Sequence, residues 1–115
     1  ERRAALEAQG AQVVCLPNAS GKVDLAAMLK DLGDKHINEV HVEAGHKLNG
    51  SLVHEGLVDE FLVYLAPKLI GQGADMANFG PLTSLAEALP LTFQSTAMVG
   101  PDLRILARVT GRDLF

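Results

Sequence analysis

The first fifth of the chain alternates between helical and extended patterns of apolar residues. Residues 1–9 have helical spacing and are followed by Gly10, which is typical of a helix end. Residues 11–16 form a short apolar run with β-branched members, which indicates a buried strand. Residues 17–21 combine proline, asparagine, serine and glycine, so they predict a loop.

A second helix, a strand and a third helix are predicted next. Apolar positions at helical spacing between residues 23 and 32 indicate a helix, and Gly33 is its expected stop. Residues 38–43 alternate between polar and apolar side chains, as a strand does. An amphipathic helix is expected from about Lys47 to Glu55, closed by Gly56.

Beyond this helix the pattern becomes more strand-like. Residues 57–66 are the clearest strand candidate, and residues 71–82 hold four glycines or prolines and predict a loop. Residues 84–88 predict a short helix opened by Thr83 or Ser84, since Glu87 stands three residues past Ser84 as in a capping box.

The end of the chain predicts a hairpin of strands at 91–97 and 103–109, joined by a turn with glycine and proline. The whole order is α-β-α-β-α-β and then the hairpin. Right-handed crossovers between the earlier strands imply that they are parallel. We therefore expect an α/β fold with a mixed, mostly parallel sheet flanked by helices and a C-terminal antiparallel hairpin.

Composition narrows the class of protein. The 115 residues suit one domain or a piece of one, and a 48% hydrophobic content argues against disorder. The net charge is -4 and no basic cluster occurs, so a nucleic-acid partner is not expected. No apolar run reaches a membrane span and no signal-peptide pattern opens the chain, which favours a cytoplasmic location. The single cysteine, Cys15, lies in an apolar run and is expected to be buried and inert.

Candidate chemistry concentrates where the predicted strand at 38–43 gives way to a helix. A helix start presents free N–H groups and a positive dipole end, which suits phosphate, and glycine allows a ligand to come close to the backbone. The sequence here lacks the lysine of a P-loop, and taken alone these residues favour the alternative, a plain tight turn into a helix. Glu43 either lies exposed at the sheet edge or faces a ligand. The four histidines show no zinc spacing, and no nucleophile elbow occurs.

Four ordered segments, residues 38–45, 48–52, 56–60 and 66–71, resemble the reductase domain of the bifunctional riboflavin-biosynthesis deaminase/reductase family. The closing hairpin turn resembles the family's last hairpin as well. The resemblance implies a dihydrofolate-reductase-like fold, with residues 1–115 forming the C-terminal part of one reductase domain. The remaining part of that domain, and a zinc-containing deaminase domain, would lie upstream.

The resemblance also implies an activity and a site. The family reduces the ribosyl group of 5-amino-6-(5-phosphoribosylamino)uracil to ribityl with NADPH and forms homodimers. Glu43 would touch this small-molecule substrate near the ribosyl group. His46 stands where the family often has proline, and the chain by itself would have little activity. The residues implied to contact NADPH are Gly45, His46, Lys47, Leu48, Asn49, Gly50 and Ser51.

Two other functions remain open. The chain could be a non-catalytic dimerisation module, because the last strands of such a domain can pair with a second copy. It could also belong to a stand-alone reductase of a pteridine or pyrimidine. An upstream deaminase signature would separate the bifunctional enzyme from the stand-alone one.

Overall fold

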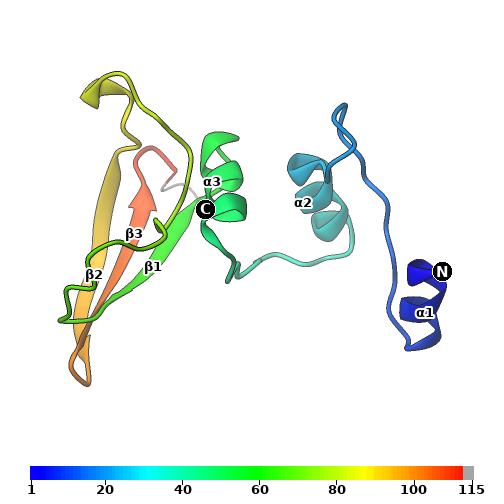
Figure 1. Cartoon of the computed structure of the whole chain (residues 1–115), viewed down its shortest axis with the longest axis horizontal. Coiled ribbons are helices and arrows are strands. Elements are labelled where there is room, and N and C mark those ends of the chain that lie inside the picture. The colour runs from blue at the N-terminus through cyan, green and yellow to red at the C-terminus, as the bar shows by residue number, and fades with distance from the viewer. Residues whose placement is uncertain (113–115) are drawn as a thin grey trace. The chain divides into compact units, whose positions relative to one another are not determined.

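The computed structural model describes residues 1–112, which divide into two compact units at His41 and Val42. The first unit carries α1 (Arg2–Ala8) and α2 (Leu25–Asp34). The second carries α3, the three strands of the sheet and a 3-10 helix (Figure 1). None of the helices within residues 1–112 combines the length and the apolar character needed to cross a membrane.

The start of α2 is closed by its own sequence. Asp24 precedes the helix in extended backbone, and its carboxylate accepts a hydrogen bond of 2.8 Å from the N–H of Ala27. This is the preferred arrangement for an N-cap, in which a side chain satisfies a donor that the helix leaves unpaired. The helix therefore begins at Leu25, whose side chain is buried, two residues later than the apolar pattern indicates.

The end of α2 differs from the prediction, because Gly33 lies inside the helix. A glycine in a helix costs only about 1 kcal/mol relative to alanine, so it does not enforce a stop. The last helical residue is Asp34, and the chain leaves the helix at His36, which adopts left-handed backbone with φ 63°. The N–H of Ile37 then bonds the carbonyl of Leu32 at 3.0 Å, which is the pattern of a Schellman end.

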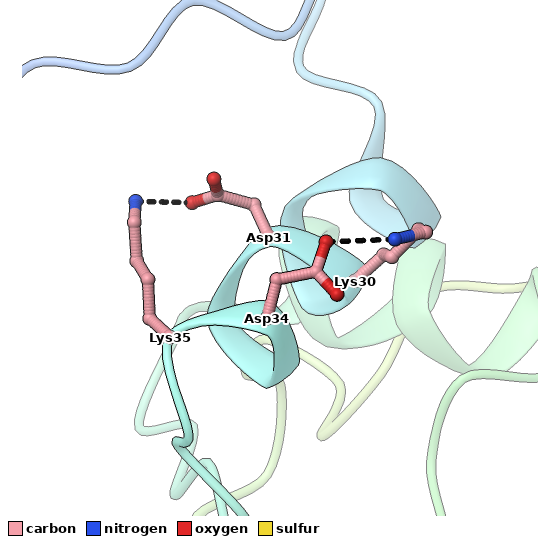
Figure 2. Close-up of polar contacts among 4 residues, drawn as sticks. All are labelled: Lys30, Asp31, Asp34 and Lys35. Carbon is pink, nitrogen blue, oxygen red and sulfur yellow. Dashed lines mark hydrogen bonds and ion pairs between the residues drawn. The ribbon is translucent and has the colours of Figure 1, made fainter.

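The solvent face of α2 carries two ion pairs at i, i+4 spacing, Lys30 with Asp34 at 2.7 Å and Asp31 with Lys35 at 2.5 Å (Figure 2). The hydrogen bond to Asp34, together with the attraction of its charge, raises the pKa of the Lys30 ammonium. Exposed pairs of this kind contribute little to stability, because water screens the two charges. They mark a solvated helix face rather than a site.

Two predicted strands do not form. Residues 11–16 are irregular, with only an isolated bridge between Pro17 and Val23 beyond them, and residues 38–43 are irregular throughout. An extended segment becomes a strand only by bonding to a neighbour, and the described residues offer neither segment one. Cys15, predicted to be buried, is exposed for the same reason.

The second unit is built on a three-stranded sheet. Its strands are β1 (Glu60–Leu65), β2 (Leu91–Val99) and β3 (Asp102–Val109), in the spatial order β1-β3-β2 (Figure 1). Both pairings are antiparallel. The predicted hairpin is confirmed, whereas the predicted parallel strands are not, because the sheet formed within residues 1–112 is antiparallel throughout.

The core of this unit centres on β3, because β3 has a strand on each side. Ala107 and Val109 point to one face of the sheet and are only 2% and 8% exposed. Their cross-strand partners are Phe61 for Ala107 and Leu91 for Val109. The register of β2 shifts between Phe93 and Ser95, where one extra residue forms a bulge.

The carboxyl end of α3 (His46–His54) is tied to the end of the sheet by Arg112. The guanidinium donates to the carbonyls of Gly56 and Val58 and to the carboxylate of Asp59, at 2.8 Å for the last. A planar guanidinium offers five donors in a fixed fork, which suits three acceptors on one loop. The connection from α3 to β1 is thereby held to the residues that follow β3.

A candidate anion site at the start of α3

The start of α3 is open. Gly45 is the residue before the helix and has no side chain with which to cap it. The N–H groups of Leu48 and Asn49 both donate to the carbonyl of Gly45, at 3.1 and 3.2 Å. The N–H groups of His46 and Lys47 come before this first helical bond, as the leading donors of every helix do.

The charges at this helix start favour an anion. The first turn of α3 holds no acidic residue, and instead carries His46 and the exposed Lys47. The partial positive charge of a helix start favours anions and disfavours cations by about 0.3–1 kcal/mol. A cation here opposes the stability of the helix, but it adds to the attraction for a bound phosphate or carboxylate.

The space in front of Gly45 is also open. A Cβ atom built on this residue would meet no heavy atom within 4 Å, and its φ of -76° is accessible to every amino acid. Glycine is therefore not required by the fold at this position. Its absence of a side chain leaves the backbone donors accessible to a ligand.

The first turn of α3 is held by the loop that follows β1. The side-chain amide of Asn49 donates to the carbonyl of Ala44 at 3.1 Å and to that of Met76 at 3.0 Å. The N–H of Asn78 donates to the carbonyl of His46 at 2.9 Å. These bonds join the segment before α3, the helix itself and residues 76–78 into one local structure.

Gly50 makes this joint possible. It is buried, and a Cβ atom on it would overlap the backbone of Asn78. Only glycine lets the two backbones come so close. This requirement is a packing one, so Gly50 has a structural role whether or not it also touches a cofactor.

The structure places the predicted cofactor contacts in two groups. The exposed group is Gly45, Lys47, Leu48 and Ser51. The group engaged with residues 76–78 is His46, Asn49 and Gly50. Glu43 is exposed and lies in irregular backbone, so it does not stand at the end of a strand as predicted. Its contact with a substrate, and the contacts of residues 45–51 with a cofactor, remain predictions.

A hollow of about 290 Å³ opens beside α3. From the sequence, the loop part of its lining is predicted only as an irregular connection. The local sequence does not predict that this loop packs against α3, because the contact between Gly50 and Asn78 joins residues far apart in the chain. The lining residues are Gly50, Ser51, His54, Glu55, Asn78, Phe79 and Gly80.

Within residues 1–112, the other features that could bear on function are groups of metal-binding side chains and a second hollow. No three side chains of histidine, cysteine, aspartate or glutamate come together as a metal site would require. A larger hollow of about 760 Å³ is lined only by residues between Lys68 and Asp75, where Leu69 and Ile70 are almost wholly exposed. This hollow is the inner side of one loop.

The chain was compared with known proteins. A family model described as the RibD C-terminal domain matches residues 1–105. The "Riboflavin biosynthesis protein RibD" of Escherichia coli is 40% identical over 93 residues, covering 80% of this chain and 25% of that protein. The "5-amino-6-(5-phosphoribosylamino)uracil reductase" of Buchnera aphidicola is 34% identical over 86 residues, covering 74% of this chain and 42% of that protein.

The solved structures agree with the sequence comparison. Acinetobacter baumannii RibD, form 2, matches with a TM-score of 0.71 and 31% sequence identity, over 77% of this chain and 25% of that one. The chain thus spans between a quarter and about two fifths of the length of these relatives. Because the family model covers residues 1–105 of the 115, the chain belongs to the RibD C-terminal domain family.

Proposed function

We propose that this chain supplies part of the active site of an NADPH-dependent reductase in riboflavin biosynthesis. The reaction is reduction of the ribosyl group of 5-amino-6-(5-phosphoribosylamino)uracil to ribityl. Membership of the family supports this proposal, as does the printed name of the Buchnera relative. The single observation in the structure that carries it is the open, positively charged start of α3.

The residues at this helix start fit the phosphates of a dinucleotide. The N–H groups of His46 and Lys47 supply donors, the Lys47 ammonium supplies charge, and Gly45 leaves the approach open. Bound NADPH supplies the hydride that reduces the sugar carbon, so no protein nucleophile is needed. The work of this chain is to hold and orient the cofactor.

Glu43 is the proposed contact to the ribosyl group of the substrate. Its carboxylate is exposed and lies two residues before Gly45 in the chain. A carboxylate two residues before Gly45 in the chain can accept a hydrogen bond from a sugar hydroxyl of the substrate. Its role in the proposed site is to orient the opened sugar at the position that receives the hydride.

The wider organisation follows from the length of the relatives. We propose that residues 1–115 form the C-terminal part of one dihydrofolate-reductase-like domain, which acts as a homodimer in the cytoplasm. A deaminase domain, with its zinc, would be a separate part of a bifunctional protein. The isolated chain is expected to turn over little substrate, since further contacts to both ligands would come from the rest of the domain.

Gly45→Asp tests the cofactor site. An aspartate is a better N-cap than glycine by only a few tenths of a kcal/mol, so it stabilises α3 slightly while it places a carboxylate over the phosphate donors. In the full-length protein, we expect NADPH affinity to fall at least about tenfold, because hydrogen bonds to charged groups contribute about 1.5–3 kcal/mol. The thermal unfolding temperature should stay the same or rise.

Gly45→Ser is the matched control. Serine also caps the helix but carries no charge, so it should weaken NADPH binding less than aspartate does. The measurement is calorimetric NADPH binding alongside thermal unfolding. Full NADPH affinity in a folded Gly45→Asp protein would refute the proposed cofactor site.

A further inference from the structure

Asn49 and Gly50 form the one Asn–Gly pair of the sequence. In such a pair the backbone nitrogen of the glycine can attack the side-chain carbonyl carbon of the asparagine, because glycine has no Cβ atom to hinder the approach. A flexible chain therefore loses the asparagine amide faster at this pair than where a bulkier residue follows. The other asparagines, Asn18, Asn38 and Asn78, are followed by alanine, glutamate and phenylalanine. Asn49 is thus the most reactive asparagine of the unfolded chain.

The reaction is a deamidation that needs only water. The glycine nitrogen forms a bond to Cγ of Asn49, the bond from Cγ to Nδ2 breaks, and the amide group leaves as ammonia with the proton of the glycine N–H. Water then opens the resulting succinimide ring at either carbonyl, which yields aspartate or isoaspartate. No electrons are gained or lost. The first step requires the nitrogen of Gly50 to lie against Cγ of Asn49.

The side chain of Asn49 is held away from this arrangement. Its Nδ2 donates to the carbonyl of Ala44 at 3.1 Å and to that of Met76 at 3.0 Å. These two acceptors use both hydrogens of the amide, so the side chain is fixed in one orientation, which points back toward the residues before α3. Both bonds must break before the amide can leave.

The backbone of Gly50 is held as well. Asn49 and Gly50 lie inside α3, where each backbone N–H points along the helix axis toward the carbonyl four residues earlier. Gly50 is also buried, and its backbone packs so closely on that of Asn78 that a Cβ atom would overlap it. Turning the peptide bond between Asn49 and Gly50 toward Cγ would break the helical turn and displace Gly50 from this packing.

These restraints belong to one joint between α3 and residues 76–78. The joint consists of the bond from Asn49 to Met76, the bond of 2.9 Å from the N–H of Asn78 to the carbonyl of His46, and the packing of Gly50. Local openings of this kind cost less free energy than unfolding of a whole unit. An opening of the joint therefore exposes Asn49 to deamidation while the strands of the sheet stay paired.

The product cannot make the joint again. The carbonyls of Ala44 and Met76 need a donor, whereas an ionised carboxylate at position 49 offers acceptors only. Isoaspartate also adds one atom to the main chain, which interrupts the helical repeat of α3. An opening that ends in reaction is therefore irreversible.

We propose that Asn49 is a deamidation site that the folded protein protects, and that its reaction releases residues 76–78 from α3. The rate is set by how often the joint opens, because the open pair reacts and the closed pair does not. Deamidation requires no cofactor, so its test is separate from that of the proposed function.

Peptide mapping by mass spectrometry of the full-length protein, incubated at mildly alkaline pH, measures the rate at Asn49. The reaction should be at least about tenfold slower in the native protein than in the same protein unfolded in urea. Gln72→Asn is the matched control, because it places a second Asn–Gly pair before Gly73, in a loop where both positions are exposed. The introduced asparagine should react in the native protein nearly as fast as in urea. Equal native rates at the two positions would overturn the proposed protection.

Asn49→Asp tests the release of the loop without waiting for the reaction. Hydrogen exchange of the Asn78 amide should become about tenfold faster, because the joint loses a donor that two carbonyls share. The amides of β3 should exchange as before. Asn38→Asp is the control, since it makes the same change at an exposed residue outside α3, and it should leave the Asn78 amide unchanged. Unaltered exchange at Asn78 in Asn49→Asp would overturn the proposed release, and the comparison of native with unfolded wild type stands even if this variant fails to fold.

Discussion

The starts of α2 and α3 are opposites. At α2, the carboxylate of Asp24 bonds the N–H of Ala27 and brings negative charge to the positive helix end. At α3, Gly45 brings no side chain, and Lys47 brings positive charge. At the 3-10 helix η1 (Leu85–Glu87) a carboxylate also closes the start, but from within the helix. The carboxylate of Glu87 accepts from the N–H and the hydroxyl of Thr83, while the N-cap Ser84 makes no side-chain cap bond.

The difference separates a structural helix start from a candidate binding site. A start closed by its own carboxylate has satisfied the donors that an anionic ligand would use. A start left open gives up that stabilisation and must be held by other contacts. For α3 these contacts come from Asn49, Gly50 and Asn78. The following predictions test this division of roles.

Gly50→Ala should have the largest effect. The new methyl group would overlap the backbone of Asn78, which cannot rotate away as a side chain can. Overpacking of this kind costs about 1–3 kcal/mol, so the urea midpoint of the full-length protein should fall. Gly73→Ala is the matched control, because a Cβ atom there meets nothing within 4 Å. Equal stability of the two variants would show that the open start of α3 does not depend on this packing.

Asp24→Ala should have a smaller effect, confined to α2. Loss of an N-cap side chain costs about 0.5–2 kcal/mol, and amide hydrogen exchange in Leu25–Asp34 should become faster. Asp24→Asn should retain most of the protection, since its side-chain oxygen still accepts the bond from Ala27. Unchanged exchange in Asp24→Ala would mean that α2 is not closed by this carboxylate.

Lys47→Glu reverses the charge at the open helix start. It should stabilise α3 by about 0.3–1 kcal/mol through the helix dipole. The same change should weaken NADPH binding by several-fold, most strongly at low salt, because salt screens the charge. A melt and a binding titration at two ionic strengths measure both effects. If both stability and affinity fall, charge at this end does not act as we propose.

Acid should loosen the closed start of η1 and leave the rest of the unit folded. The hydrogen bond from the Thr83 hydroxyl, then that from its N–H, lowers the pKa of Glu87 below its ordinary value of 4.5. A carboxylate with a lowered pKa contributes stability that is present above its unfolded pKa and is lost as pH falls through the folded one. The Thr83 amide signal in NMR should therefore shift only below pH 4.5, and Glu87→Gln should abolish that shift.

The sequence predicted those elements whose signals are local. The hairpin at 91–97 and 103–109, the limits of α3 and the capping pair of Glu87 all depend on residues close together in the chain. The strand predictions at 11–16 and 38–43 were wrong for this structure, because a strand also needs a partner that its own residues do not specify.

The candidate site was predictable to the same extent. The helix start near Gly45 follows from the sequence, and the structure places Gly45 directly before α3 without a side-chain cap. The packing of residues 76–80 against α3 cannot be predicted from the sequence, because the residues around Gly50 and Asn78 do not indicate that these two positions are in contact. The hollow lined by His54 and Glu55 could not be predicted from the sequence for the same reason.

The order of strands in the sheet has a consequence for synthesis on the ribosome. The strand that pairs with β1 is β3, and the paired Glu60 and Arg108 stand 48 positions apart. At about 5–20 residues per second, β1 waits for several seconds with its apolar side chains unpaired. During that interval β1 can be bound by chaperones or can pair with a strand of another nascent chain. Once β2 and β3 have been synthesised, their hairpin forms within microseconds. The free edge of β3 can then pair with β1.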